Sequence, residues 1–154
     1  MRAIEATLPE GFKIIKPNTE EEWKSYYDIR FEVLRKPWNQ PQQSTRDEWE
    51  DRSIHFLVMN ENAEGIATGR LQLNSKTEGQ IRSMAVLEKY RNKNIGHLII
   101  KEIETEAKSL GLNTITLDAR EPALNFYLKN DYVVIADSYL LFGVIKHFSM
   151  KKSI

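Results

Sequence analysis

The sequence predicts an α/β fold of the α+β kind: a mixed, mostly antiparallel central sheet of about six or seven strands with helices on both faces. Three consecutive apolar segments separated by short glycine-containing turns are typical of an antiparallel meander. An amphipathic segment and another apolar strand follow them, and this strand, helix, strand order is typical of a parallel crossover. A chain of 154 residues is long enough for one core, so we expect a single domain over residues 1–154.

The N-terminal part of the chain is expected to form one amphipathic helix and then a long loop. The helix is predicted at about 19–35, because Thr19 and Glu22 have the spacing of a capping box and Pro37 ends the pattern. Its buried stripe is predicted to be Trp23, Tyr26, Tyr27, Phe31 and Leu34. The loop over 38–53 is rich in amides and charges without periodicity, and loops of this length are often functional.

The remaining elements are read from changes in the periodicity of the apolar residues. Strands are predicted at 54–60, 65–74, 80–87 and 114–119, with two more at 132–139 and 141–151. Helices are predicted at 95–110 and 121–129, and Gly111 stands where a helix C-terminus favours glycine. The stripe of the longer helix consists of Ile95, Leu98, Ile99, Ile103, Ala107 and Leu110.

Composition excludes several classes of protein. Lys plus Arg and Asp plus Glu both total 22, so no overall field attracts nucleic acid or an anionic membrane, and neither is expected as a partner. The absence of cysteine excludes disulfides and thiolate metal sites. The three histidines, His55, His97 and His147, lie on separate predicted elements without ligand spacing, so no metal is expected. No apolar run approaches the roughly 20 residues that span a bilayer, and a cytoplasmic protein is the expectation.

The turn between the strand at 80–87 and the helix that follows has the features of an anion site. A helix N-terminus leaves about four N–H groups unpaired and carries a partial positive charge. Gly96 permits close approach to the backbone, Asn94 tolerates a left-handed conformation, and Arg91 and Lys93 add positive charge. The alternative is that Gly96 serves packing and that the basic residues are solvated surface.

Two segments resemble a known family. SMAVLEKYRNKNIGHLIIKEIETEAKSLG resembles the central motif of the GNAT superfamily of acyl-CoA-dependent N-acyltransferases: Gln or Arg, two residues, Gly, one residue, then Gly or Ala. Arg91, Asn94 and Gly96 occupy these positions, with Asn94 in place of the first glycine. DAREPALNFYLKNDYVVI is similar to the second cofactor motif, in which Ala-x-x-Phe-Tyr begins a helix that a Gly-Phe pair follows. Ala123, Phe126 and Tyr127 match this motif, and Asp131 and Tyr132 stand in place of the Gly-Phe pair.

The resemblance implies the GNAT-like sheet described above and acetyl-CoA, or another acyl-CoA, as co-substrate. Its pyrophosphate would bind the N–H groups of roughly Arg91 to His97, its pantetheine arm would pair with the strand at Met84 and Val86, and its thioester would lie between the strands at 80–87 and 114–119. The implied cofactor-binding residues are Met84, Ala85, Val86, Arg91, Asn92, Lys93, Asn94, Ile95, Gly96, His97, Asn125 and Tyr127. His97 is expected to face phosphate or solvent.

The resemblance also implies catalytic roles. Tyr127 matches the family's acid position, and a phenol stays protonated at pH 7 and can donate to a leaving thiolate. Many family members carry a glutamate on the strand before the cofactor turn, but GQIRSMAV offers no carboxylate. His55 or His147 would then be the base. His147 is preferred, because GVIKHFSM resembles the closing strand of a bacterial subgroup, although a lone histidine on an apolar strand is more often structural.

Three functions follow from these motifs. The first is transfer of an acetyl group from acetyl-CoA to a primary amine, in a small molecule or a peptide, by direct attack in a ternary complex. The second is a non-catalytic acyl-CoA-binding or sensor domain. The third is a nucleotide-binding module, although the chain lacks the glycine patterns typical of one. The acidic residues of the loop either attract a cationic acceptor or form a solvated surface: Asp47, Glu48, Glu50 and Asp51. The apolar segment YLLFGVI is a candidate homodimer contact. Asp118 and Arg120 are a candidate ion pair.

Overall fold

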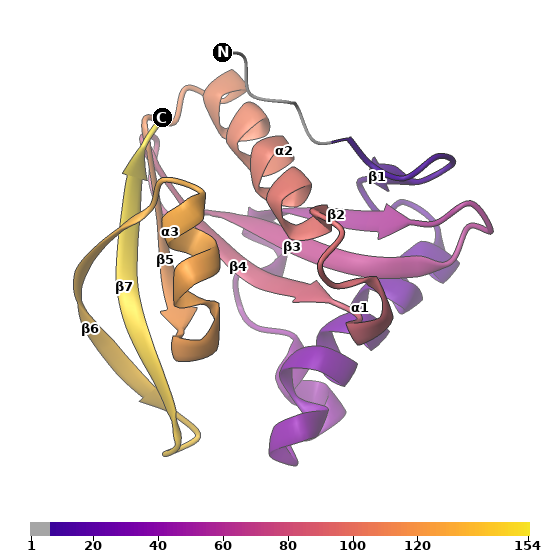
Figure 1. Cartoon of the computed structure of the whole chain (residues 1–154), viewed down its shortest axis with the longest axis horizontal. Coiled ribbons are helices and arrows are strands. Elements are labelled where there is room, and N and C mark those ends of the chain that lie inside the picture. Colours follow the sequence, from indigo (N-terminus) through magenta and orange to yellow (C-terminus); the bar gives the residue numbers. More distant parts are fainter. Residues whose placement is uncertain (1–6) are drawn as a thin grey trace.

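The computed structural model describes residues 7–154, and its centre is a seven-stranded sheet with the strand order β1-β2-β3-β4-β5-β7-β6 (Figure 1). The strands are β1 (Lys13–Ile15), β2 (Ser53–Met59), β3 (Gly65–Leu73), β4 (Glu78–Val86), β5 (Thr114–Arg120), β6 (Val133–Leu141) and β7 (Ile145–Ser153). All neighbouring pairs are antiparallel except β4 and β5. The expected mixed, mostly antiparallel sheet is therefore confirmed. The short strand β1 was not predicted.

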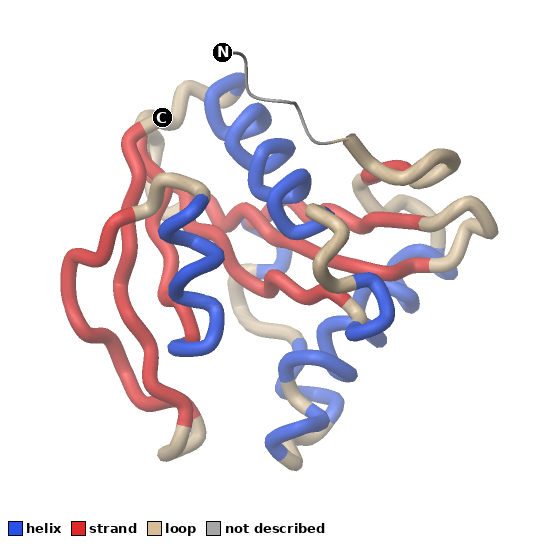
Figure 2. Tube along the Cα trace, viewed as in Figure 1, coloured by secondary structure: helices blue, strands red, loops and turns tan. Residues whose placement is uncertain are grey.

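The helices are α1 (Glu20–Leu34), α2 (Ile95–Ser109) and α3 (Leu124–Lys129), and they lie on both faces of the sheet (Figure 2). Alternation along β2 separates the two cores. Phe56 and Val58 belong to the larger cluster with the apolar residues of α2, whereas Leu57 and Met59 pack with α1. No helix among residues 7–154 is long and apolar enough to cross a membrane.

Local sequence accounts for how α1 and α2 begin and end. The predicted capping box is present, since the Glu22 N–H donates to Thr19 Oγ1 at 3.1 Å and the Thr19 N–H donates to Glu22 Oε1 at 3.2 Å. Gly111 follows α2 with φ +81°, as a glycine after a helix C-terminus is expected to do. Leu110 was wrongly assigned to the buried stripe: α2 ends at Ser109, and Leu110 is 47% exposed.

Two predicted elements differ in detail from the structure. The loop over 38–53 is organised by short 3₁₀ turns at Lys36–Trp38, Gln42–Thr45 and Glu50–Arg52. The helix predicted at 121–129 begins as a 3₁₀ turn, Glu121–Ala123, and only then becomes α3.

The feature that positions the candidate site is the divergence of β4 from β5. Their parallel pairing extends only from Glu78↔Thr114 to Gln80↔Thr116, and beyond it the two strands separate (Figure 1). Ser83 has φ 55° in the second half of β4, next to a shift in the β3–β4 register. Such a bulge bends a strand and re-aims its side chains. Within residues 7–154, the bend leaves one edge of β4 without a strand partner from Ile81 to Val86.

Candidate active site

The turn from β4 into α2 leads into a helix N-terminus that no side chain caps. Asn94 is the N-cap residue with φ 63°, and its side chain makes no capping hydrogen bond. Asn92 is also left-handed, with φ 63°. Arg91 and Lys93 are exposed beside the turn, and Arg91 Nε donates to the Val86 carbonyl at 3.0 Å. Within residues 7–154, this end of α2 therefore has backbone donors and positive charge together.

Gly96 serves the packing of α2 against α3, which was the alternative interpretation of this glycine from the sequence. Its φ is not in the left-handed region, so its backbone conformation does not require glycine. A Cβ at this position would lie 2.9 Å from Cζ of Phe126, on α3. Gly96 thus allows the ring of Phe126 to pack against the first turn of α2, and it joins the two resembling motifs in space.

His97 holds α2 and α3 together. Its Nδ1 lies 2.5 Å from Oδ1 of Asn130, and Asn130 Nδ2 donates to the Phe126 carbonyl at 2.9 Å. Because Oδ1 of an amide is an acceptor, His97 Nδ1 carries the proton. The side chain is half-buried against α3, so the expectation that it faces phosphate or solvent does not describe its contact here.

Tyr127 combines burial with a free hydroxyl. It is 7% exposed, and its hydroxyl makes no hydrogen bond with any residue among 7–154 that meets ordinary distance criteria. Burial raises the pKa of Tyr127 well above its usual range, and the nearby Arg120 guanidinium only partly offsets this effect. The phenol is therefore protonated at neutral pH and keeps its proton available for a ligand.

The two candidate bases have different surroundings. His55 Nε2 lies 2.8 Å from the Glu50 carbonyl, and its Nδ1 lies 2.7 Å from the hydroxyl of Tyr26. Since a carbonyl only accepts, Nε2 carries the proton and Nδ1 accepts from Tyr26. Both ring nitrogens of His55 are used within the protein, which favours a structural role.

His147 is also buried, at 3% exposure, and its Nδ1 lies 3.0 Å from the Ile145 carbonyl. The ring stacks on Tyr139 at 4.6 Å, and His147 stands opposite Arg120 in the β5–β7 register. Burial, with a further contribution from Arg120, lowers the pKa of His147. The histidine is therefore neutral at pH 7, and with the proton on Nδ1 its Nε2 carries a lone pair.

The loop over 38–53 is tied to the sheet by a buried charge network that the sequence did not indicate. Glu50 forms ion pairs with Arg30, which is 2% exposed, and with Arg70, which is fully buried. Asp47 binds Arg70 Nη2 at 2.9 Å. Two of the four acidic residues expected to attract a cationic acceptor are thus engaged by arginines of the chain itself. The available signal in the sequence was that Arg70 is the single charged residue of its strand.

The candidate ion pair between Asp118 and Arg120 is not formed. Asp118 Oδ1 accepts from the hydroxyls of Ser138 at 2.7 Å and Ser149 at 3.0 Å. Arg120 Nη2 instead donates to the Leu34 carbonyl at 3.2 Å. Arg120 therefore reaches across to the end of α1, because helix C-terminal carbonyls attract cations.

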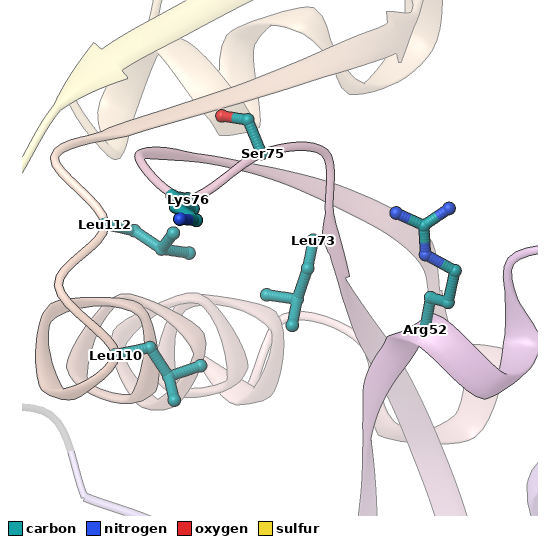
Figure 3. Close-up of a pocket in the computed structure, with 6 residues that line it drawn as sticks. All are labelled: Arg52, Leu73, Ser75, Lys76, Leu110 and Leu112. Carbon is teal, nitrogen blue, oxygen red and sulfur yellow. The ribbon is translucent and has the colours of Figure 1, made fainter.

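Two surface hollows lie apart from these residues. The larger has a volume of about 690 Å³ and lies beyond the C-terminal end of α2, the opposite end from Gly96 (Figure 3). It is lined by Arg52, Leu73, Ser75, Lys76, Leu110 and Leu112. The smaller, of about 380 Å³, lies where Tyr27 meets the loop at Gln42 to Arg46. Neither hollow is lined by a predicted cofactor-binding or catalytic residue.

A mixed sheet whose central parallel strands diverge beside an uncapped helix N-terminus is the arrangement expected of the acetyltransferase fold that the two sequence segments resemble. The chain belongs to the acetyltransferase (GNAT) family, whose model matches residues 23–132. It is 29% identical over 140 residues to the Bacillus subtilis protein YjcF, described as an uncharacterized N-acetyltransferase, covering 91% of this chain and 99% of YjcF.

Solved structures show the same fold. A Lactobacillus plantarum structure matches with a TM-score of 0.82 at 19% identity, covering 94% of this chain and 99% of the other. A GNAT family acetyltransferase from Elizabethkingia anophelis, with acetyl-CoA bound, matches with a TM-score of 0.74 at 15% identity, covering 95% and 100%. At these identities the likeness establishes the fold, and the chemistry has to be argued from the residues of this chain.

Proposed function

We propose that the protein transfers an acetyl group from acetyl-CoA to a primary amine by direct attack in a ternary complex. The observation that carries the proposal is the combination of the separated strands β4 and β5, the uncapped N-terminus of α2 and the hydroxyl of the otherwise buried Tyr127, which has no partner among residues 7–154. Membership of the acetyltransferase family and the acetyl-CoA bound to a structural relative support the choice of cofactor.

The residues of the chain fit this cofactor. The backbone N–H groups from Asn92 to His97 would bind its pyrophosphate, whereas the Arg91 N–H already donates to the Glu88 carbonyl at 3.2 Å. The exposed side chains of Arg91 and Lys93 would supply positive charge. The free edge of β4 at Met84 and Val86 would pair with the amide groups of its pantetheine arm, as an added strand would. Arg91 would have to share or release the Val86 carbonyl, which has a second lone pair.

The acetyl thioester supplies the activated acyl group. A backbone N–H near Met84 to Val86 would polarise its carbonyl oxygen, and the neutral amine would form the new C–N bond as the C–S bond breaks. Tyr127 would donate its phenolic proton to the departing sulfur. His147 would remove the proton lost by the amine, directly or through a water molecule, since its lowered pKa leaves the ring neutral at pH 7. The products are the acetylated amine and free CoA thiol.

The proposal is tested by cofactor binding and by thiol release. Acetyl-CoA should raise the melting temperature of the wild-type protein, and a suitable amine should then release free CoA. Tyr127→Phe should keep the cofactor-dependent stabilisation and lower kcat by about 10²-fold or more, because it removes only the proposed acid. Tyr132→Phe is the matched control, since that buried hydroxyl donates to Glu104 at 3.0 Å and has no proposed role in the transfer.

The outcomes separate the alternatives. Absence of a shift with millimolar acetyl-CoA would reject the proposal, and binding without thiol release for any amine would favour the sensor. Intersecting initial-rate lines are expected for a ternary complex, whereas parallel lines would indicate an acylated protein. His147→Gln should lower kcat and remove the acidic limb of the pH profile, and an unchanged profile would exclude His147 as the base.

We also propose a homodimer through β6, an edge strand that pairs only with β7 in the described sheet. Its exposed apolar residues include Val133 (57%), Ile135 (56%) and Leu140 (57%). Exposed apolar edge strands are typical sites of association. Sedimentation should give twice the mass of the chain, and Ile135→Lys should give a monomer.

A further inference from the structure

Three arginines gather on the α1 face of the sheet, where β4 and β5 separate. Arg35 follows α1, and its Nη1 donates to the Leu34 carbonyl at 3.1 Å. Arg120, the last residue of β5, donates from Nη2 to the same oxygen at 3.2 Å. The two guanidinium groups therefore lie side by side. Arg82, on β4, stands opposite Arg70 in the β3–β4 register and so shares the face on which Arg70 meets the loop.

The pKa values of Arg35 and Arg120 are lowered, as expected for positive charges that are partly buried. Burial lowers the pKa of Arg35, and Arg120, Arg30 and Arg82 add to this effect. Burial also lowers the pKa of Arg120. Both arginines are half-buried, so their like charges are held close together with limited solvent screening.

No carboxylate of the described chain neutralises this group. Among residues 7–154, none of Arg35, Arg82 and Arg120 has an ion pair within 4.0 Å. The nearby acidic groups are engaged elsewhere: Glu50 and Asp47 bind Arg30 and Arg70, and Asp118 accepts from two serine hydroxyls. Arg82 also forms no side-chain hydrogen bond with any residue among 7–154, although it is half-buried. No nitrogen of Arg82 is buried without a partner, so its guanidinium is accessible to a ligand, and an anion would form a charge-assisted pair with it.

The three arginines adjoin the groups proposed to carry out the transfer. Arg120 stands opposite His147 in the β5–β7 register, and its charge acts on the hydroxyl of Tyr127. An acceptor held by an anionic group on these arginines would present its amine close to both. The planar guanidinium of an arginine presents two parallel N–H donors that match the two oxygens of a carboxylate. A carboxylate is therefore the anion that best fits these arginines.

We propose that the acceptor is a small amine that also carries a carboxylate, such as an amino acid, and that Arg82 binds the carboxylate together with Arg35 and Arg120. This inference rests on the proposed acetyltransferase function. It replaces the expectation of a cationic acceptor, because the acidic residues nearest the sheet are already paired with Arg30 and Arg70.

The test compares amines that differ only in the carboxylate, with thiol release as the readout: L-phenylalanine against phenethylamine, L-lysine against cadaverine, and 4-aminobutyrate against butylamine. In the wild-type protein kcat/KM for at least one carboxylate-bearing member should exceed that of its partner about tenfold or more. O-phosphoethanolamine against ethanolamine asks whether phosphate is the preferred anion, and a larger preference there would overturn the assignment of a carboxylate.

Arg82→Gln should raise KM for the carboxylate-bearing amine about tenfold and leave KM for acetyl-CoA unchanged, so that the preference is lost. Arg52→Gln is the matched control: Arg52 is exposed and lies over the ring of Trp49, beside the hollow in Figure 3. The Arg52→Gln variant should prefer the carboxylate-bearing amines as strongly as the wild-type protein does.

Equal or better use of the amines without a carboxylate would overturn the inference, as would a preference that survives Arg82→Gln. Calorimetric titration with acetyl-CoA is carried out separately. Failure of that binding rejects the proposed function itself, whereas tight binding with turnover only of amines that lack a carboxylate overturns the inference about the acceptor alone.

Discussion

Replacing Glu50 by glutamine tests the buried charge network most directly. The carboxylate is 12% exposed and pairs with two arginines whose exposures are 2% and 0%. It also accepts from the hydroxyl of Tyr27 at 2.9 Å. Glutamine keeps nearly the same shape and one acceptor oxygen but removes the charge. Asp47 would then be the only carboxylate left in contact with either Arg30 or Arg70 within the described chain.

Removing one partner of a buried ion pair costs about 3–5 kcal/mol, because the remaining charge is left uncompensated. The lower end, about 3 kcal/mol, is expected here, since glutamine keeps part of the hydrogen bonding. That is a large share of a total stability of about 5–15 kcal/mol. For a domain of this size it corresponds to a decrease in melting temperature of about 6–12 °C.

Urea unfolding at pH 7, followed by tryptophan fluorescence and circular dichroism, measures the free energy of unfolding. Glu48→Gln is the matched control, because Glu48 is exposed and makes no ion pair with a described residue, and it should change stability by less than about 0.5 kcal/mol. If Glu50→Gln costs less than about 1 kcal/mol, the network does not stabilise the fold as argued.

Three further predictions concern the cofactor turn and the histidines. Gly96→Ala should weaken both stability and CoA binding, because its Cβ would lie 2.9 Å from Cζ of Phe126, and adding Phe126→Leu should recover part of both losses in urea unfolding and CoA titration. Asn94→Gly should tighten CoA binding in the same titration, since glycine adopts the left-handed conformation (φ 63°) without a side chain beside the turn; weaker binding would contradict a pyrophosphate site there. Burial lowers the pKa of His55 and of His147 below the usual 6.5, so the unfolded chain binds protons more readily than the folded one. Stability should therefore be full above about pH 6.5 and fall as the pH decreases toward 5, which urea midpoints across that range would measure.

The fold was predictable where one local signal decided an element. The Thr19–Glu22 capping box, Gly111 and the change from strand to helix periodicity each act within a few residues, and the elements they predict are present. β1 was missed because a strand of three residues carries no period. Arg30 was not expected to be buried, because its partner lies 20 positions away in a loop whose sequence has no regular pattern.

In the candidate site, the local sequence indicated which residues to consider, but their contacts depend on segments that are distant in the sequence. The motif indicated Gly96, but contact with Phe126, from another helix, explains why a side chain is excluded there. His55 and His147 looked alike as lone histidines on apolar strands. Their partners distinguish them, since both nitrogens of His55 are used whereas Nδ1 of His147 meets the Ile145 carbonyl. Such differences depend on which strands become neighbours.

The charge network also connects stability with the proposed acceptor site. Arg30 Nη2 donates to the Thr45 carbonyl at 2.5 Å and Arg35 Nε donates to the Ser44 carbonyl at 3.0 Å, so both arginines hold the loop against α1. The cofactor turn lies on the other side of β4, at the start of α2. If Glu50→Gln loosens this loop, KM for the acceptor should rise while KM for acetyl-CoA stays near the wild-type value. Equal increases in both constants would instead mean that the substitution disturbs β4 as a whole, and the loop would then have no separate part in acceptor binding.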